Sequence, residues 1–199
     1  MADDTIEYLL QQQVETEFPQ WFEAYARNPA NNITCPYVLA LASGPLRGAV
    51  TFPSYVVNGL RFDTHGRGVH KETANSGVSM LGADIGGEGQ DFFGTLRRIV
   101  RIEYPGVPLK RTVLFEVDWY DPTPHGTKVH AEYDLVEINK KKKYKKYEPF
   151  VLANQATQAV YFPYPGVSRV KSDWLGVIPI RARAKNEYVE KDESITNSF

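Results

Sequence analysis

Alternation between apolar and polar residues is strongest in the second half of the chain, where it recurs over four segments. These segments are "TLRRIVRIEY" (95–104), "RTVLFEVDWY" (111–120), "KVHAEYDLVEIN" (128–139) and "PFVLANQATQAVYFPY" (149–164). A two-residue period is typical of antiparallel strands with one face buried. Turn-rich connections, "PGVPLK" and "DPTPHGT", separate the first three. The pattern therefore predicts a mainly β protein, either a small curled antiparallel sheet or an SH3-like barrel.

Shorter strand signals flank these four segments. "SYVVNGLRFDT" places two β-rich runs around Asn58 and Gly59, a dipeptide typical of a tight hairpin turn. "NSGVSML" is another possible strand. "WLGVIPIRA" is a last strand, and Pro179 predicts that it lies at the edge of the sheet.

The N-terminal part carries the only helical periodicity. Ile6, Leu9 and Leu10 recur at helical spacing, and Pro19 predicts a break followed by a second short helix. Trp21 in that second helix belongs to an aromatic cluster that we expect to dock onto the body of the protein. Within the following connection, "YVLALASG" fits a short strand or a helical turn equally well.

These patterns predict a division of the chain into three parts. Residues 1–54 form a short N-terminal helical segment and an irregular connection, 55–183 form the β domain, and 184–199 form a polar tail. The glycine-rich stretch "GADIGGEGQD" reads as a mobile loop. It lacks the Gly-Lys-Ser/Thr ending and the strand-to-helix context of a phosphate-binding loop.

Composition narrows the class of protein. The 199 residues are 42% hydrophobic and 13% aromatic with a net charge of −1, so any nucleic-acid affinity must come from a local patch. Cys35 is the single cysteine, which excludes an internal disulfide framework and fits a reducing compartment. No apolar run is long enough for a membrane span and no signal peptide is evident, so we expect a soluble intracellular protein.

The main candidate for a binding surface is a lysine run in "EINKKKKYKKYEPFVLANQ" (137–155), which the strand pattern places in a hairpin loop. Such a run can be a solvated loop or, joined by other basic residues, a contact to phosphates. The candidate nucleic-acid-binding residues are Arg97, Arg98, Arg101, Lys110, Arg111, Lys140, Lys141, Lys142, Lys143, Lys145 and Lys146. The run becomes a DNA contact only if the arginines of "LRRIVR" share its face.

A second candidate is an aromatic pocket able to hold a cation over ring faces, although core packing explains the same residues. Its members are Phe115, Trp119, Tyr120 and Tyr133. Catalytic signals are weak. The histidine spacings do not match a metal motif, no G-x-S-x-G is present, and carboxylates on strands are commonly solvent-facing. We therefore expect no catalytic residues, no metal and no cofactor.

Five motifs occur in an order that resembles a known family: "FPQWF", "VVNGLRFDTHGRGVHKETANSGVSM", "DFFGTLRRIVRIEYPG", "RTVLFEVDWYD" and "EPFVLANQATQAVYFPYP". Over residues 18–180 the chain resembles DUF4216, a plant domain of unknown function found in transposase-like proteins of CACTA (En/Spm) elements. The resemblance implies a transposon origin and a nuclear location, and it supplies no catalytic residues.

Three functions remain open from the sequence. The first is a non-enzymatic module that binds the DNA backbone, or a chromatin or transposase partner, through a basic rim over 97–147. The second is a protein-interaction domain that takes a peptide or a second copy of the chain. The third is a metal-dependent nuclease using Asp118, Asp121 and Asp134.

Overall fold

A computed structural model describes residues 2–68, 75–82, 91–130, 132–133, 135–144, 149–164 and 173–180. The chain divides into two compact units. Unit 1 comprises residues 1–50 and 101–113, and unit 2 comprises 51–100 and 114–199, so the three boundaries between them each fall within a strand. Residues 83–90 of the expected glycine-rich loop (82–91) and the polar tail at 184–199 lie outside the described residues.

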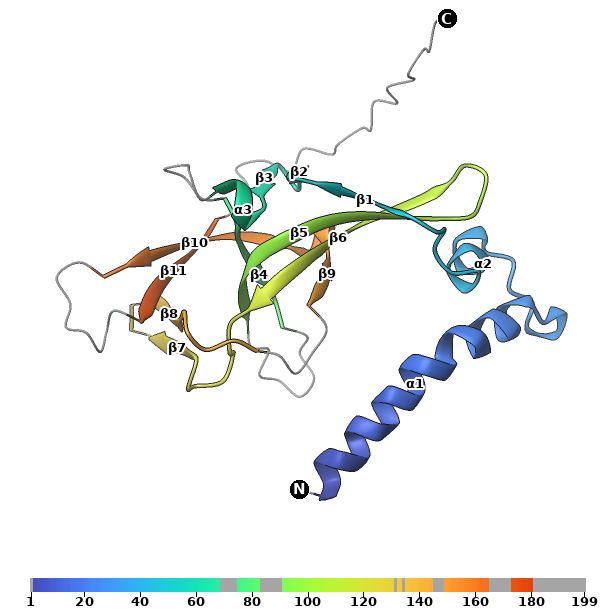
Figure 1. The fold of residues 1–199 in the computed structure, drawn as a ribbon, viewed down its shortest axis with the longest axis horizontal. Coiled ribbons are helices and arrows are strands. Elements are labelled where there is room, and N and C mark those ends of the chain that lie inside the picture. The colour runs from blue at the N-terminus through green and yellow to red at the C-terminus, as the bar shows by residue number, and fades with distance from the viewer. Residues whose placement is uncertain are drawn as a thin grey trace, which may run out of the picture. The chain divides into compact units, whose positions relative to one another are not determined.

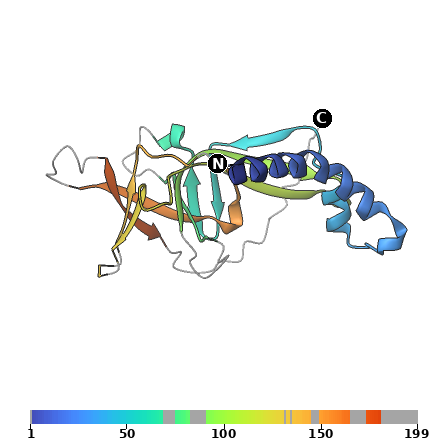
Figure 2. The same ribbon diagram turned by 90° about the horizontal axis from the view of Figure 1, so that it is seen from below.

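Unit 1 begins with one continuous helix, α1 (Ala2–Arg27), and not with two (Figures 1 and 2). The predicted break at Pro19 is wrong, because the helix continues through this residue. A proline inside a helix removes one hydrogen bond to the carbonyl four residues earlier, here that of Glu15. The loss of this one hydrogen bond leaves the helix continuous from Ala2 to Arg27.

Residues 28–50 of unit 1 form short elements. These are η1 (Pro29–Asn31), α2 (Pro36–Ala42) and the start of β1 (Ala49–Phe52). The segment "YVLALASG", which periodicity left undecided, is thus largely helical. In the described part of unit 1 the buried apolar residues are Ala26, Ala40 and Ala42. Among the described residues, no helix combines the length and the hydropathy needed to cross a membrane.

Unit 2 is built on a large antiparallel sheet, which confirms the mainly β prediction (Figure 1). The sheet has nine strands, paired in the order β7-β8-β11-β10-β4-β5-β6-β9, with β1 pairing with β5 off this path. The strands not yet bounded are β4 (Gly77–Met80), β5 (Phe92–Tyr104), β6 (Lys110–Trp119), β7 (Thr127–His130), β8 (Leu135–Asn139), β9 (Phe150–Leu152), β10 (Thr157–Pro163) and β11 (Trp174–Ile180). β7 and β9 are the two ends of this strand order, and among the described residues they do not pair with each other. The sheet is therefore open, and the structure is the curled sheet and not the barrel.

The predicted Asn-Gly hairpin is confirmed. It joins β2 (Ser54–Val57) to β3 (Leu60–Asp63) in a separate two-stranded sheet. Asn58 and Gly59 have φ angles of 52° and 73°, which is the left-handed pair that a type I′ turn requires. A short helix, α3 (His65–Gly68), follows β3.

Two segments predicted as single strands are each divided. Residues 128–139 form the β7–β8 hairpin, in which Val129 pairs with Val136. The amide of Tyr133 donates to the carbonyl of His130 at 3.1 Å, and this turn interrupts the apparent alternation. Residues 149–164 form β9 and β10, separated by η2 (Ala153–Gln155).

The edge position predicted for the last strand is also wrong. β11 lies between β8 and β10 in the sheet. Its pairing with β8 runs only from Trp174 to Val177, whereas its pairing with β10 continues to Ile180. Pro179 therefore lies beyond the end of β8, where one flank of the strand needs no ladder hydrogen bond and a proline is tolerated.

Two groups of buried side chains hold unit 2 together. Alternate residues of β6, Phe115, Val117 and Trp119, are buried as the alternation predicts. The rings of Phe115 and Phe62 lie 5.0 Å apart, which packs the β2–β3 hairpin against the large sheet. A second cluster consists of Phe93, Tyr120, Ile138, Ala159 and Val177.

The close approach of β4 to β10 makes a stability prediction. A Cβ at Gly77 would collide with the backbone carbonyl of Ala159, and backbone cannot rotate away as a side chain can. We expect Gly77→Ala to lower the free energy of unfolding by about 1 to 3 kcal/mol. Gly66→Ala is the matched control, since a Cβ there meets no atom within 4 Å. Equal denaturant midpoints for the two variants would contradict the close packing of β4 against β10.

Candidate nucleic-acid interface

The lysine run does not form the predicted hairpin loop. β8 and β9, the strands on either side of it, lie far apart in the sheet order, and each pairs with other strands. The run instead passes along the end of β6. The amide of Asp121 donates to the carbonyl of Lys142 at 3.1 Å, and the amide of Tyr144 donates to the carbonyl of Trp119 at 2.9 Å. We call residues 140–144 the lysine segment.

Asn139 shapes the beginning of the lysine segment. Its side-chain oxygen accepts from the amide of Lys141 at 3.1 Å, and its carbonyl accepts from the amide of Lys142 at 3.1 Å. Asparagine favours such turns because its short side chain can bond the backbone two residues ahead. This turn leaves the side chains of Lys140 and Lys142 exposed to solvent.

Lys143 occupies a different environment from the lysines before it. Its backbone forms a β-bridge with Tyr120, and its Nζ lies 3.7 Å from the centroid of the Tyr120 ring. Although the residue as a whole is exposed, the amine packs over the ring. Partial burial lowers the pKa of Lys143, and the negative charge of Asp118 opposes that shift.

Lys143 and Arg97 line the same cleft, which has a volume of about 340 Å³. Its other lining residues are Val117, Asp118, Trp119, Tyr144 and Pro149. Arg97 Nη1 lies 3.4 Å from Oδ1 of Asp118. The structure thus places Arg97, one of the three arginines of "LRRIVR", in a cleft with Lys143, whereas the DNA hypothesis asked all three arginines to share the face of the lysine run.

Arg97 and Arg98 are both exposed, although they are neighbours on β5. Leu96 and Ile99 on either side are fully buried, so the alternation breaks as it does at a β-bulge. Arg98 forms an ion pair with Glu116 on β6. Both cations therefore lie beside carboxylates of the neighbouring strand.

The remaining predicted basic residues are divided between the units. In unit 1, Glu103 forms ion pairs with two arginines. Its Oε1 lies 3.6 Å from Nη2 of Arg101 and 3.1 Å from Nε of Arg111. Lys110 Nζ lies 4.3 Å from the centroid of the Tyr37 ring. Lys145 and Lys146 lie outside the described residues. The predicted basic residues in the described part of unit 2 are Arg97, Arg98, Lys140, Lys141, Lys142 and Lys143, and of these Arg97 and Lys143 share the cleft.

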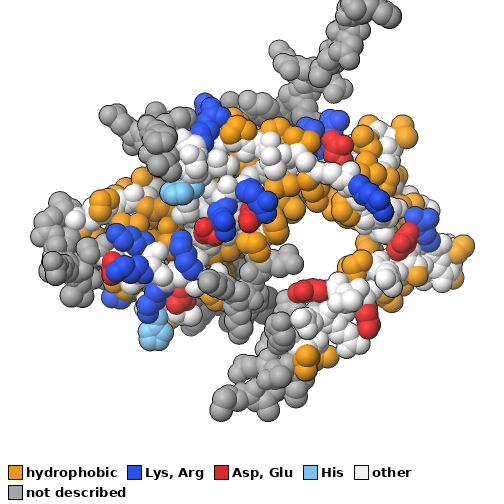
Figure 3. Space-filling view, in the orientation of Figure 1, with side chains coloured by type: hydrophobic (Ala, Val, Ile, Leu, Met, Phe, Trp, Pro, Cys, Tyr) orange, Lys and Arg blue, Asp and Glu red, His pale blue; other side chains and the backbone are white. Residues whose placement is uncertain are grey.

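Acidic groups are interspersed with this basic set. Lys141 Nζ lies 2.8 Å from Oδ2 of Asp173, in addition to the pairs of Arg97 and Arg98. Figure 3 shows lysine and arginine side chains alternating with carboxylates over this face of the sheet. The surface is a mixed one, with local cation excess along the lysine segment.

The four residues proposed as an aromatic pocket occupy separate environments. Phe115 is fully buried against Phe62, and Trp119 is buried beside Phe92. Tyr120 is buried with its hydroxyl 3.0 Å from Thr95 Oγ1, and Tyr133 is 73% exposed. The core-packing explanation fits the first three residues. One ring of the set, Tyr120, does carry a cation, which is the chain's own Lys143.

Two of the three carboxylates considered for a metal site contact other groups of the protein. Asp118 pairs with Arg97, and Oδ1 of Asp121 accepts from the amide of Thr123 at 3.0 Å. Asp134 lies outside the described residues. Within the described ranges, no group of three or more histidine, cysteine, aspartate or glutamate residues is placed to hold a metal ion.

Sequence reasoning did not assign a role to Tyr144 or to Asp118 in the basic surface. Tyr144 lies inside the lysine run, and its ring centroid lies 6.1 Å from that of Phe92, so the aromatic residue anchors the run to the sheet. The aromatic interruption of "KKKKYKK" is the sequence signal for this anchoring. The pairing of Asp118 with Arg97 had no local signal, because the two residues are joined only by strand register.

The environment of Lys143 yields a prediction about proton binding. We expect its amine to titrate below the ordinary pKa of a lysine, because burial disfavours the ammonium. Asp118→Asn should lower the pKa further, because the carboxylate favours the charged form. Side-chain ¹⁵N NMR titration, with Lys143→Arg to assign the signal, measures both values. A pKa that does not respond to Asp118→Asn would contradict the placement of Lys143 in this cleft.

Comparison with known proteins identifies one segment of the chain. Residues 100–177 match the family model DUF4216, described as a domain of unknown function. Comparisons with curated proteins and with solved structures gave no match. The match begins within β5, includes the lysine segment and ends within β11. The resemblance predicted over residues 18–180 is thus confirmed for residues 100–177, which match this family model.

Proposed function

We propose that the chain is a non-enzymatic binding module that contacts the phosphate backbone of DNA through the basic surface of unit 2. The observation that carries this proposal is the shared cleft of Arg97 and Lys143, with Lys140 and Lys142 exposed nearby in sequence. A surface of this kind recognises regularly spaced phosphates without reading base sequence.

The carboxylates on this surface do not prevent such binding. Exposed ion pairs contribute little, about 0 to 1 kcal/mol each, because water and salt screen them. A phosphate that approaches Arg97 competes with Asp118 at 3.4 Å, a separation longer than a close charge-assisted hydrogen bond. Acidic neighbours weaken non-specific attraction and so favour moderate, salt-sensitive affinity.

The biological context is part of the same proposal. The DUF4216 match and the order of the five motifs support derivation from a plant CACTA (En/Spm)-type transposon protein. Such a protein would act in the nucleus, where DNA, chromatin or a transposase is the partner. In this context the module supplies binding, and catalysis belongs to another protein or region.

Salt titration tests the DNA proposal. We expect the logarithm of duplex affinity to fall linearly with the logarithm of salt concentration, and Lys142→Ser to reduce the slope by about 0.9, because one phosphate contact is lost. Serine at all four positions 140–143 should reduce the slope further. Arg47→Ser, which removes an exposed cation of unit 1, is the matched control. No duplex binding at low ionic strength, or an equal loss in the control, would contradict the proposal.

A second candidate function, protein interaction, is favoured by the exposed face of α1. Large apolar side chains follow one stripe of this helix at spacings of three and four residues. They are Leu10, Val14, Phe18, Trp21 and Tyr25. The rings of Trp21 and Tyr25 stack at 5.1 Å, and a groove of about 310 Å³ runs along the stripe.

The charges of α1 indicate the chemistry of its partner. Residues 9–27 contain three glutamates and one arginine, so three negative charges and one positive charge give a net charge of −2. Arg27 is itself paired with Glu23 at 2.9 Å. An acidic amphipathic helix fits an apolar groove with a basic border. We propose a protein partner with such a groove as the occupant of this face.

Designed amphipathic peptides test this second candidate. A leucine–lysine peptide should quench or shift the fluorescence of Trp21, and Phe18→Ser should weaken binding by about tenfold or more. Leu9→Ser is the control, because Leu9 is equally exposed but lies off the stripe. Equal binding of a leucine–glutamate peptide would contradict the charge argument. Dimerisation through the same stripe in sedimentation equilibrium would replace the basic partner with a second copy.

A further inference from the structure

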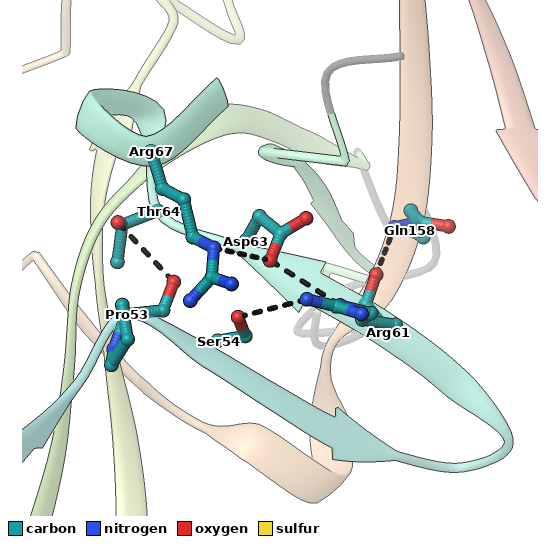
Figure 4. Close-up of polar contacts among 7 residues, drawn as sticks. All are labelled: Pro53, Ser54, Arg61, Asp63, Thr64, Arg67 and Gln158. Atoms are coloured by element: carbon teal, nitrogen blue, oxygen red, sulfur yellow. Dashed lines mark hydrogen bonds and ion pairs between the residues drawn. The ribbon is translucent and has the colours of Figure 1, made fainter. Parts of the chain in front are cut away.

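A buried carboxylate at the end of β3 lies beside two arginines, one on β3 and one on α3, within the motif "VVNGLRFDTHGRG". The side chain of Asp63 is only 3% exposed. Its Oδ1 lies 3.4 Å from Arg61 Nε and 3.8 Å from Arg67 Nε (Figure 4). Burial of an ionised carboxylate is costly without positive partners, so Asp63 requires at least one of these arginines.

The backbones of both arginines are held in place. Arg61 pairs with Val56 across the hairpin, and its carbonyl accepts from Nε2 of the buried Gln158 at 2.7 Å. Arg67 lies in a turn that is closed by its own amide, which donates to the carbonyl of Thr64 at 3.0 Å. The two guanidinium groups are therefore presented from fixed points on β3 and α3.

Arg61 and Arg67 remain partly exposed to solvent although both contact Asp63. Both distances exceed the roughly 2.7–2.9 Å of a close charge-assisted hydrogen bond, and both use Nε instead of the two-nitrogen fork. The side chains of Arg61 and Arg67 are 51% and 41% exposed. Nη2 of Arg61 also lies 3.4 Å from Oγ of Ser54, which places a hydroxyl beside the pair.

The carboxylate of Asp63 and the guanidinium groups of Arg61 and Arg67 carry a summed charge of +1. The structure assigns to Arg61, Arg67 and Ser54 an oxyanion-binding site whose ligand is a phosphate group. Planar guanidinium forks match the several oxygens of phosphate, and a hydroxyl supplies a further donor. Asp63 acts as a positioning residue that orients both arginines and competes with the ligand. The phosphate can be a free or monoester group, or one from a nucleic-acid backbone.

NMR of the full ¹⁵N-labelled chain tests this site with inorganic phosphate as the probe. At constant ionic strength, exchanging chloride for phosphate should shift the Nε signals of Arg61 and Arg67 along one saturating curve. The Nε signal of Arg27, which pairs with Glu23 and has no second arginine described beside it, is the control. A common, non-saturating drift of all three signals would overturn the inference.

Variants separate a binding site from a purely structural ion pair. Arg67→Gln should weaken phosphate affinity by about tenfold or more, because one fork is removed. Asp63→Asn should strengthen it, because the local charge rises from +1 to +2 and the competing carboxylate is lost. A structural pair predicts no phosphate response in any of these proteins. If Asp63→Asn does not fold in thermal unfolding, Ser54→Ala replaces it and should weaken affinity while the fold is retained.

Duplex DNA without terminal phosphates distinguishes the two sources of the ligand. Arg61 and Arg67 signals that respond to DNA as well as to inorganic phosphate indicate a backbone phosphate, and a response to inorganic phosphate alone indicates a free or monoester group. Lys142→Ser should leave the phosphate response unchanged. Absence of duplex binding by the unmodified chain, with a retained phosphate response, defeats only the proposed function. Arg61 and Arg67 signals that do not change when phosphate is added defeat only this inference.

Discussion

The contact between Phe62 and Phe115 is the interaction on which the arrangement of unit 2 depends. Both rings are fully buried, and they join a two-stranded hairpin to a nine-stranded sheet that has no ladder pairing with it among the described residues. Complete burial of an aromatic ring stabilises a fold by about 3 kcal/mol. The same contact holds β3 in place, and so it fixes where Arg61 and Asp63 lie. Packing of apolar rings thus determines the position of the polar network.

Cations and carboxylates share the surface of unit 2 in two different ways. On β5 and β6, Arg97 and Arg98 face exposed or half-buried carboxylates across the strands, where water screens each pair. At Asp63 the carboxylate is buried, and two arginines compensate its charge from the solvent side. The first arrangement makes a broad surface with modest local charge. The second concentrates donors around one point, which suits a single anionic group.

Local features of this fold follow from the sequence, whereas the choice of strand neighbours does not. The Asn58-Gly59 turn and the buried alternation of Phe115, Val117 and Trp119 depend on residues close in sequence, and both were predicted. The insertion of β11 between β8 and β10 depends on which apolar faces pack together over long separations. For the candidate interface, the basic residues were identifiable. Arg97 and Lys143 line one cleft because Lys143 forms a β-bridge with Tyr120, and no local sequence pattern predicts that bridge.

The place of β11 has a consequence for the order in which the protein can be assembled during synthesis. In the strand path, β11 is the single link between the β7–β8 hairpin and the strands from β10 to β9. It is also the last described strand to leave the ribosome. Until it emerges, β8 and β10 each present an unpaired edge to the cell, and such edges attract other chains. β11 covers both edges and joins the two parts of the strand path.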